Sequence, residues 1–93
     1  MSALLSPSDL KSGLASLPGW AHKGKAITRE YAFPDFTNAL LFVNHVGYLA
    51  QAADHHPDID IRYRKVTLTL STHSEGGLTA KDVQLAGQID RAH

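Results

Sequence analysis

The fold is decided by residues 61–73, which read IRYRKVTLTLSTH. Apolar and polar residues alternate here, with Val66, Leu68 and Leu70 on one side and Tyr63, the threonines, the serine and His73 on the other. Because successive side chains of a strand point to opposite faces of a sheet, the alternation predicts β-structure with one apolar and one polar face. We expect one long strand or two short ones, packed on helices through the apolar face.

A long helix is predicted before this stretch. Apolar residues recur at helical spacing from Phe36 onward, and Phe42 and Leu49 widen the apolar surface beyond a single stripe. Pro57 disfavours helical geometry in the residue before it, so the helix should end at residues 54–55. A helix with so wide an apolar surface is either deeply buried or shared with a second subunit.

The remaining elements follow from capping and turn signals. Residues 6–9, which read SPSD, predict the start of a first helix that ends before Pro18, and residues 79–82, which read TAKD, predict the start of a last one. Between the first helix and the central one, residues 20–23 and 26–33 are expected to pair as a hairpin. This order predicts an α+β fold, an antiparallel four-stranded sheet with three helices packed on one face, as one domain over residues 1–93.

The composition narrows the classes of function. The chain has 93 residues with nine basic and nine acidic side chains, so the positive field that binds phosphate backbones is missing, and we expect no direct contact with nucleic acid. Without cysteine the chain forms neither disulfides nor thiolate metal sites, which suits the cytoplasm. No stretch reaches the roughly 20 apolar residues that span a bilayer, so we expect no membrane contact.

Six histidines in so short a chain are the most informative feature for function, because histidine titrates nearest to neutral pH. His55 and His56 stand at the end of the central helix, His73 stands at the end of the predicted strand, and Asp82 lies in the first turn of the last helix. If these ends bracket one cleft, one imidazole can take a proton while a second group donates one. These four residues are therefore candidates for general acid–base catalysis.

Each candidate also has a structural explanation. Asp82 can act as the third residue of a capping box that begins at Thr79, and His73 can be an exposed histidine at a strand end. The adjacent histidine pair can interact with the free carbonyls of a helix end. A metal site is a further alternative, but adjacent histidines cannot easily converge on one ion and His45 lies about three turns earlier, so we expect no metal.

Residues between Gln51 and Asp82 together resemble the signature of pterin-4a-carbinolamine dehydratases. The resemblance is carried, with agreeing spacings, by His55-His56-Pro57, Tyr63, Ser71-Thr72-His73, Gly77-Leu78-Thr79 and Asp82. The apolar pattern that leads into the central helix is similar as well, through Phe33, Phe36, Ala39, Phe42 and Val46.

The resemblance implies an activity, an assembly and a set of roles. Members of the family dehydrate 4a-hydroxytetrahydropterin to quinonoid dihydropterin without metal or cofactor, which recycles the pterin of aromatic amino acid hydroxylases, and they form dimers that often pair into tetramers. By resemblance, His55 and His73 are the proton-transfer pair, His56 supports binding, and Asp82 orients or charges a histidine. The residues expected to line the pterin pocket are Pro57, Ser71 and Thr72.

One position departs from the family. Gln51 stands where the family usually carries glutamate or another ionisable residue, four residues before His55. On a helix this spacing puts both side chains on one face, so we expect the amide to bind the substrate and to hydrogen-bond the His55 imidazole without stabilising its cation. The sequence therefore predicts a weaker acid at His55.

The same family supplies a second possibility for function. It includes dimerisation partners of a transcription factor and relatives linked to Rubisco assembly, and such members tend to lose site residues. The alternative is therefore a catalytically weak relative that acts as a protein-binding or assembly module. The presence of all three histidines and Asp82 favours the enzyme.

Overall fold

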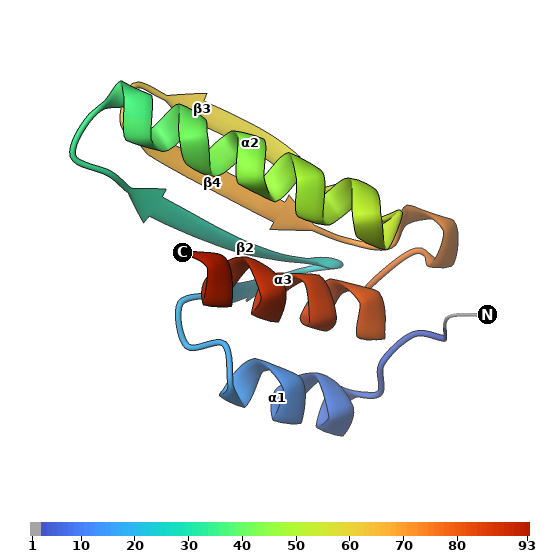
Figure 1. Ribbon diagram of the computed structural model, residues 1–93. Coiled ribbons are helices and arrows are strands. Elements are labelled where there is room, and N and C mark those ends of the chain that lie inside the picture. The colour runs from blue at the N-terminus through green and yellow to red at the C-terminus, as the bar shows by residue number, and fades with distance from the viewer. Residues whose placement is uncertain (1–2) are drawn as a thin grey trace.

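The alternating stretch at residues 61–73 contributes to two neighbouring strands of one sheet. In a computed structural model, which describes residues 3–93, the chain forms a four-stranded antiparallel sheet in the order β1-β2-β4-β3 (Figure 1). The strands are β1 (Ala21–Lys23), β2 (Ala26–Ala32), β3 (Asp58–Arg62) and β4 (Lys65–Leu70). The predicted hairpin and the predicted antiparallel sheet are both confirmed.

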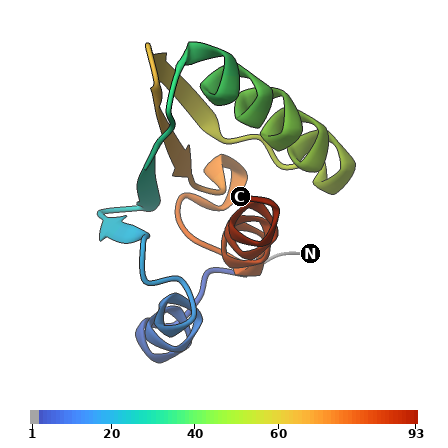
Figure 2. The same cartoon turned by 60° about the vertical axis from the view of Figure 1, so that its left-hand side comes forward.

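The helices lie on one side of this sheet. They are α1 (Pro7–Ala15), α2 (Phe36–Ala53) and α3 (Ala80–Ala92), with a short 3₁₀ helix, η1 (His73–Glu75), between β4 and α3. The turned view in Figure 2 shows α2 and α3 over the sheet and α1 beside α3, at the end of the sheet formed by β1. This arrangement confirms the predicted α+β class.

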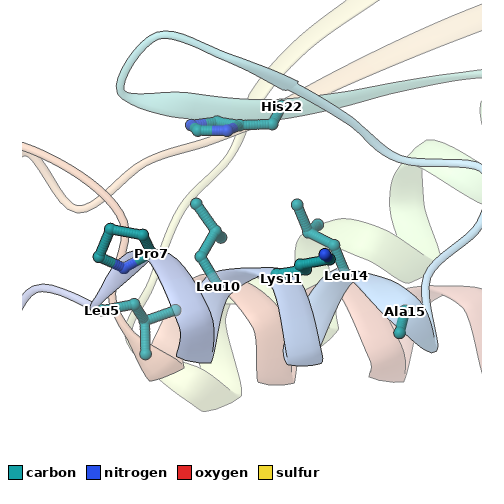
Figure 3. A pocket seen from close by; sticks show the side chains of 7 residues that line it. All are labelled: Leu5, Pro7, Leu10, Lys11, Leu14, Ala15 and His22. Atoms are coloured by element: carbon teal, nitrogen blue, oxygen red, sulfur yellow. The ribbon is translucent and has the colours of Figure 1, made fainter.

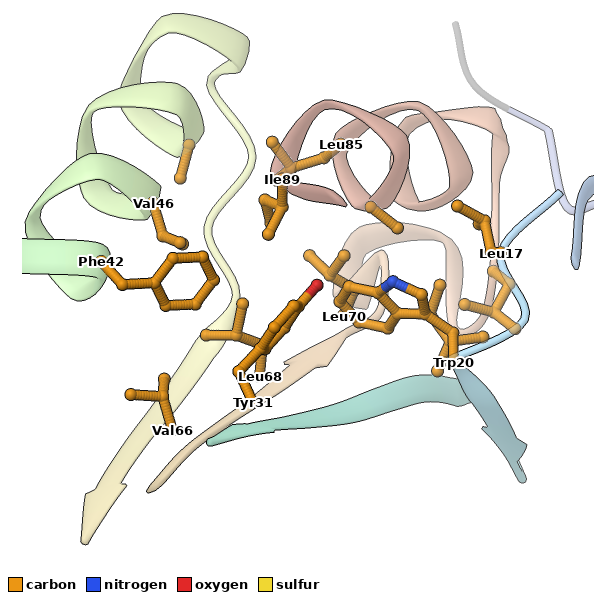
Figure 4. Close-up of a cluster of buried hydrophobic side chains, with 14 of the residues drawn as sticks. Leu17, Trp20, Tyr31, Phe42, Val46, Val66, Leu68, Leu70, Leu85 and Ile89 are labelled. Carbon is orange, nitrogen blue, oxygen red and sulfur yellow. The ribbon is translucent and has the colours of Figure 1, made fainter. Parts of the chain in front are cut away.

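The core lies between the sheet and helices α2 and α3. Val66, Leu68 and Leu70 of β4 are fully buried, as their alternation predicted. Tyr31 of β2 stands opposite Val66, and both face the helices. Figure 4 shows these strand residues meeting buried side chains of the two helices. The helix residues labelled there are Phe42 and Val46 of α2 and Leu85 and Ile89 of α3.

Each of the three α-helices is preceded by a residue whose side chain accepts a backbone N–H. Ser6 caps α1 and Thr79 caps α3, as the sequence predicts, and Asp35 caps α2. The backbone N–H of Asn38 is the main reason why the pKa of the Asp35 carboxyl lies below its ordinary value, and the Asn38 side chain adds to this effect. Helix α1 ends at Ala15, earlier than the Pro18 boundary predicted from the sequence.

The alternating stretch differs from a single strand in two places. Tyr63 adopts a left-handed backbone conformation with φ of 54° and forms a two-residue turn with Arg64 between β3 and β4. The expectation that Tyr63 lies on a strand face was therefore wrong. Strand β4 ends at Leu70, and His73 begins η1 instead of ending a strand, because the chain turns back where Thr72 pairs with Gly77.

A carboxylate near the end of α3 ties the sheet to the N-terminal part of the chain. The indole N–H of Trp20 donates to both oxygens of Asp90 at 3.1 Å, and Arg29 donates to one of them at 3.0 Å. The hydroxyl of Tyr31 donates to the same carboxylate. Burial and then this hydrogen bond raise the pKa of the Tyr31 phenol well above its ordinary value.

This shift predicts a loss of stability in alkali. The folded protein keeps Tyr31 protonated where an unfolded chain, with the ordinary tyrosine value of 10.0, has lost the proton. The stabilising contribution is therefore complete below pH 10 and falls as the pH rises above it. We expect Tyr31→Phe to cost about 2 kcal/mol of unfolding free energy at neutral pH through the lost hydrogen bond. Its stability should fall less steeply than that of the unmodified protein above pH 10.

Urea unfolding at pH 9 and at pH 11 measures this difference. The matched control is Tyr63→Phe, because Tyr63 is 69% exposed and should leave the alkaline slope unchanged. Equal slopes for Tyr31→Phe and the unmodified protein would contradict the assignment.

Candidate functional site

Asp82 is the centre of a buried group of polar side chains. It is the third residue of α3 and is fully buried, and its Oδ2 accepts the backbone N–H of Thr79 at 2.9 Å. The hydroxyl of Thr72, just beyond the end of β4, donates to the same oxygen at 2.8 Å. The capping box predicted from the sequence is confirmed, but it uses only one of the two carboxylate oxygens of Asp82.

His55 hydrogen-bonds the other carboxylate oxygen of Asp82. Its Nε2 lies 2.6 Å from Oδ1 of Asp82, and only 8% of the residue is exposed. A carboxylate accepts hydrogen bonds, so this contact places the proton on Nε2 and leaves Nδ1 as the ring nitrogen that Asp82 does not hold. The contact therefore fixes the orientation of the His55 ring beside a carboxylate.

The end of α2 sets the direction of His55. Asp54 takes a left-handed conformation with φ of 51° and caps the helix, and the backbone N–H of His55 returns to the carbonyl of Ala50 at 3.0 Å. The chain therefore leaves the helix axis at Asp54 and turns the His55 ring toward the start of α3. Figure 1 shows this end of α2 beside the loop that joins β4 to α3.

His56 points elsewhere and contacts Gln51. Its Nε2 donates to the amide oxygen of Gln51 at 3.0 Å, and the residue is exposed. The expectation that Gln51 hydrogen-bonds His55 is therefore wrong. The reason is the turn at Asp54, because the helical spacing that would have aligned Gln51 with His55 stops at Ala53.

Ser71 and His73 lie on the side of the chain opposite to Thr72. They line a hollow of about 290 Å³, whose other lining residues are Lys25, Ala26, Asp58, Thr69 and Gly76. The Ser71 hydroxyl donates to the carbonyl of Lys25 at 2.7 Å, which ties the β1–β2 turn to this hollow. His73 is exposed at its rim.

His55 lines a different hollow of about 300 Å³. It is formed with Ala53 at the end of α2 and with residues of α3, namely Lys81, Gln84, Leu85 and Gln88. The structure thus brings His55, Thr72 and Asp82 together, pairs His56 with Gln51, and places Ser71 with His73. Along the chain, His56 and Pro57 connect His55 at one hollow to Asp58 at the other.

Asp58 and Lys25 are among the lining residues that were not singled out from the sequence. Asp58 could have been singled out, because it directly follows the His-His-Pro motif. Lys25 is brought there by the pairing of β1, β2 and β4, which no local pattern reveals. His45 lies apart and lines a hollow with His93. Within residues 3–93, no group of three or more histidine, aspartate or glutamate side chains is arranged to hold a metal ion.

Comparisons with known proteins agree on the family. A family model described as pterin 4 alpha carbinolamine dehydratase matches residues 3–92. A relative from Roseiflexus castenholzii, provisionally named pterin-4-alpha-carbinolamine dehydratase, is 53% identical over 97% of both chains. A relative from Mycobacteroides abscessus with the same provisional name is 48% identical over 95% of this chain and 94% of its own.

Solved structures show the same fold. A transcriptional coactivator/pterin dehydratase from Brucella melitensis superposes with a TM-score of 0.90 at 36% identity, over 95% of this chain and 96% of that one. A pterin dehydratase-like protein identified as a RuBisCO assembly factor in the α-carboxysome has a TM-score of 0.67 at 21% identity, over 78% of this chain and 87% of that one. The second likeness concerns the fold alone.

Among the helices of residues 3–93, none has the length and apolar character that a membrane span requires. With a family model over residues 3–92 and a relative 53% identical over 97% of both chains, this chain belongs to the pterin-4a-carbinolamine dehydratase family.

Proposed function

We propose that this protein removes water from 4a-hydroxytetrahydropterin to give quinonoid dihydropterin, by histidine general acid–base catalysis, and so takes part in pterin recycling. The observation that carries the proposal is the buried contact of 2.6 Å between His55 and Asp82, in a chain of the dehydratase family. A buried imidazole with a fixed ring and a carboxylate beside it is well suited to move a proton.

The reaction needs two proton transfers and little else. The bond from C4a to the hydroxyl oxygen breaks more easily when an acid protonates that oxygen, because water leaves more readily than hydroxide. A base takes the proton from a ring N–H, so the proton donated and the proton removed balance. Both groups have to lie within hydrogen-bond reach, about 2.6–3.2 Å, of the atoms that they serve.

The proposed roles are those that membership of the family implies, and the contact between His55 and Asp82 supports the first of them. His55 offers Nδ1 for proton transfer, while Asp82 is a positioning residue that holds Nε2 and stabilises the cation. His73 is the second proton-transfer residue, and Ser71 and Thr72 hold the segment that carries it. His56 and Pro57 connect the two hollows along the chain, and the binding role proposed for both residues is the one that the family implies.

Stopped-flow measurement of pterin dehydration tests this function. The unmodified protein should accelerate the reaction above the rate in buffer, and His55→Ala and His73→Ala should each lower kcat by about 10²-fold. Asp82→Asn should lower kcat with little change in KM, because the substrate does not need that charge to bind. A protein that does no better than buffer would reject the enzyme and leave the binding or assembly module as the function.

The matched control is His45→Ala. His45 is an exposed histidine of α2 that lines a hollow separate from both site hollows, so its loss should leave kcat and KM unchanged. An equal loss of rate in His45→Ala would show that the effect is general and not specific to the site.

Gln51→Glu tests the departure from the family. Because Gln51 contacts His56, a carboxylate at this position should favour the imidazolium form of His56 and place a negative charge at the binding segment. We expect kcat/KM for dehydration to rise severalfold. Asn44→Asp, which adds the same charge to α2 about two turns earlier, should leave the kinetics unchanged. Unchanged kinetics in Gln51→Glu would make the position immaterial.

We also propose that the protein forms homodimers or homotetramers. Four large apolar side chains of α2 are exposed on the side of the helix away from the core, and they are Phe36 (45%), Leu40 (42%), Leu41 (61%) and Tyr48 (78%). Exposed apolar side chains that gather on one surface often mark an interface, so this outward face of α2 supports contact with a second copy.

Charges introduced into this outward face of α2 should weaken self-association. In sedimentation velocity, Leu41→Lys combined with Tyr48→Lys should shift the protein to a smaller species, because burying an unpaired charge is costly. Ser12→Lys, at an exposed position of α1, should keep the original size. An unchanged size in the double variant would refute α2 as the interface.

A further inference from the structure

Helix α1 is packed loosely compared with the other two helices. None of its nine residues is buried, although Leu10 and Leu14 give it an apolar face. It contacts α3 through Gly13, where an added Cβ would lie 3.1 Å from a methyl carbon of Val83. The face that carries Leu10 and Leu14 is turned toward the β1–β2 hairpin, and it is only half-buried.

A hollow of about 620 Å³ lies between this face and the hairpin. Its lining residues are Leu5, Pro7, Leu10, Lys11, Leu14, Ala15 and His22. Figure 3 shows Leu10 and Leu14 pointing from α1 toward the ring of His22, which lies across from them on the hairpin. Small-molecule sites are typically apolar hollows of about 300–1,000 Å³ with a few polar groups, and this hollow matches that description.

The polar groups of the hollow are basic. Pro7, Leu10, Lys11 and Leu14 share one face of α1, because residues three and four apart lie together on a helix. By the same spacing, Asp9 falls on the opposite face of the helix. Among the described residues, no acidic side chain lines the hollow, so Lys11 is placed to attract an anion.

His22 covers the apolar floor in a fixed orientation. Its Nε2 donates to the carbonyl of Gly24 at 2.7 Å, since a carbonyl oxygen only accepts. The ring is therefore held within the turn of the hairpin and presents its flat surface to the leucines (Figure 3). Lys23 and Lys25, which follow on the same hairpin, are exposed.

We propose that this hollow binds an amphiphilic carboxylate, with its alkyl or aryl tail between Leu10, Leu14 and the His22 ring and its carboxylate on Lys11. The hollow shares no lining residue with either hollow of the candidate active site. The proposal therefore does not depend on the dehydration reaction, and it gives the protein a second ligand with chemistry unlike that of a pterin.

Calorimetric titration of the full chain with decanoate and with decanol tests the proposal. Decanoate should bind more tightly than decanol. Lys11→Met, which keeps an apolar chain but removes the charge, should weaken decanoate binding about fivefold and leave decanol unchanged. Leu10→Ala should weaken both ligands about tenfold, because both use the apolar floor. Lys65→Met, which removes an exposed lysine of β4, should change neither.

Four results would overturn the proposal. The first is no heat of binding for decanoate at millimolar concentration. The second is decanoate binding that Lys11→Met and Lys65→Met affect equally. The third is a change in oligomer size in Lys11→Met without any decanoate binding, which would make the hollow a contact between copies of the chain. Amide NMR shifts should fall on α1 and the hairpin, and shifts confined to α2 would also contradict it.

Discussion

A buried carboxylate is costly unless donors surround it, and Asp82 meets this requirement with donors from three separate elements. The imidazole of His55 comes from the end of α2, the hydroxyl of Thr72 from the end of β4, and the N–H of Thr79 from the start of α3. The Thr72 hydroxyl uses its one hydrogen in the bond to Asp82, so it can only accept in its 2.8 Å contact with Thr79. The Thr79 hydroxyl is therefore the donor there and completes the group. One carboxylate thus fixes both the meeting point of the helices with the sheet and the ring of the candidate catalytic histidine.

The elements that follow periodicity and capping rules could be predicted from the sequence. The alternation at Val66, Leu68 and Leu70 identified the buried face of β4, and Thr79 with Asp82 identified the start of α3. The turn at Tyr63 escaped prediction because no glycine or asparagine marks it, and a bulky residue rarely takes a positive φ. The alternation continued through the turn and concealed it.

The site was less predictable than the fold. The candidate residues could be chosen by type and spacing, but their partners depend on tertiary contacts. Asp82 was interpreted either as a helix cap or as a partner of a histidine, and the structure shows that its two oxygens allow both. The partner of Gln51 could not be inferred from helical spacing because the helix ends two residues after it. Lys25 reaches the hollow of His73 only through the strand order.

The left-handed residue at Asp54 limits how this sequence can change in length. Between the last residue of α2 at Ala53 and the ring of Pro57, the chain has just enough residues to turn one imidazole inward and the next outward. Deleting or inserting one residue here would exchange the two histidines, so that the ring beside the buried carboxylate would belong to the wrong position. Lengthening a loop elsewhere costs little free energy. Residues 54–57, by contrast, must keep their number in any related sequence that retains the site.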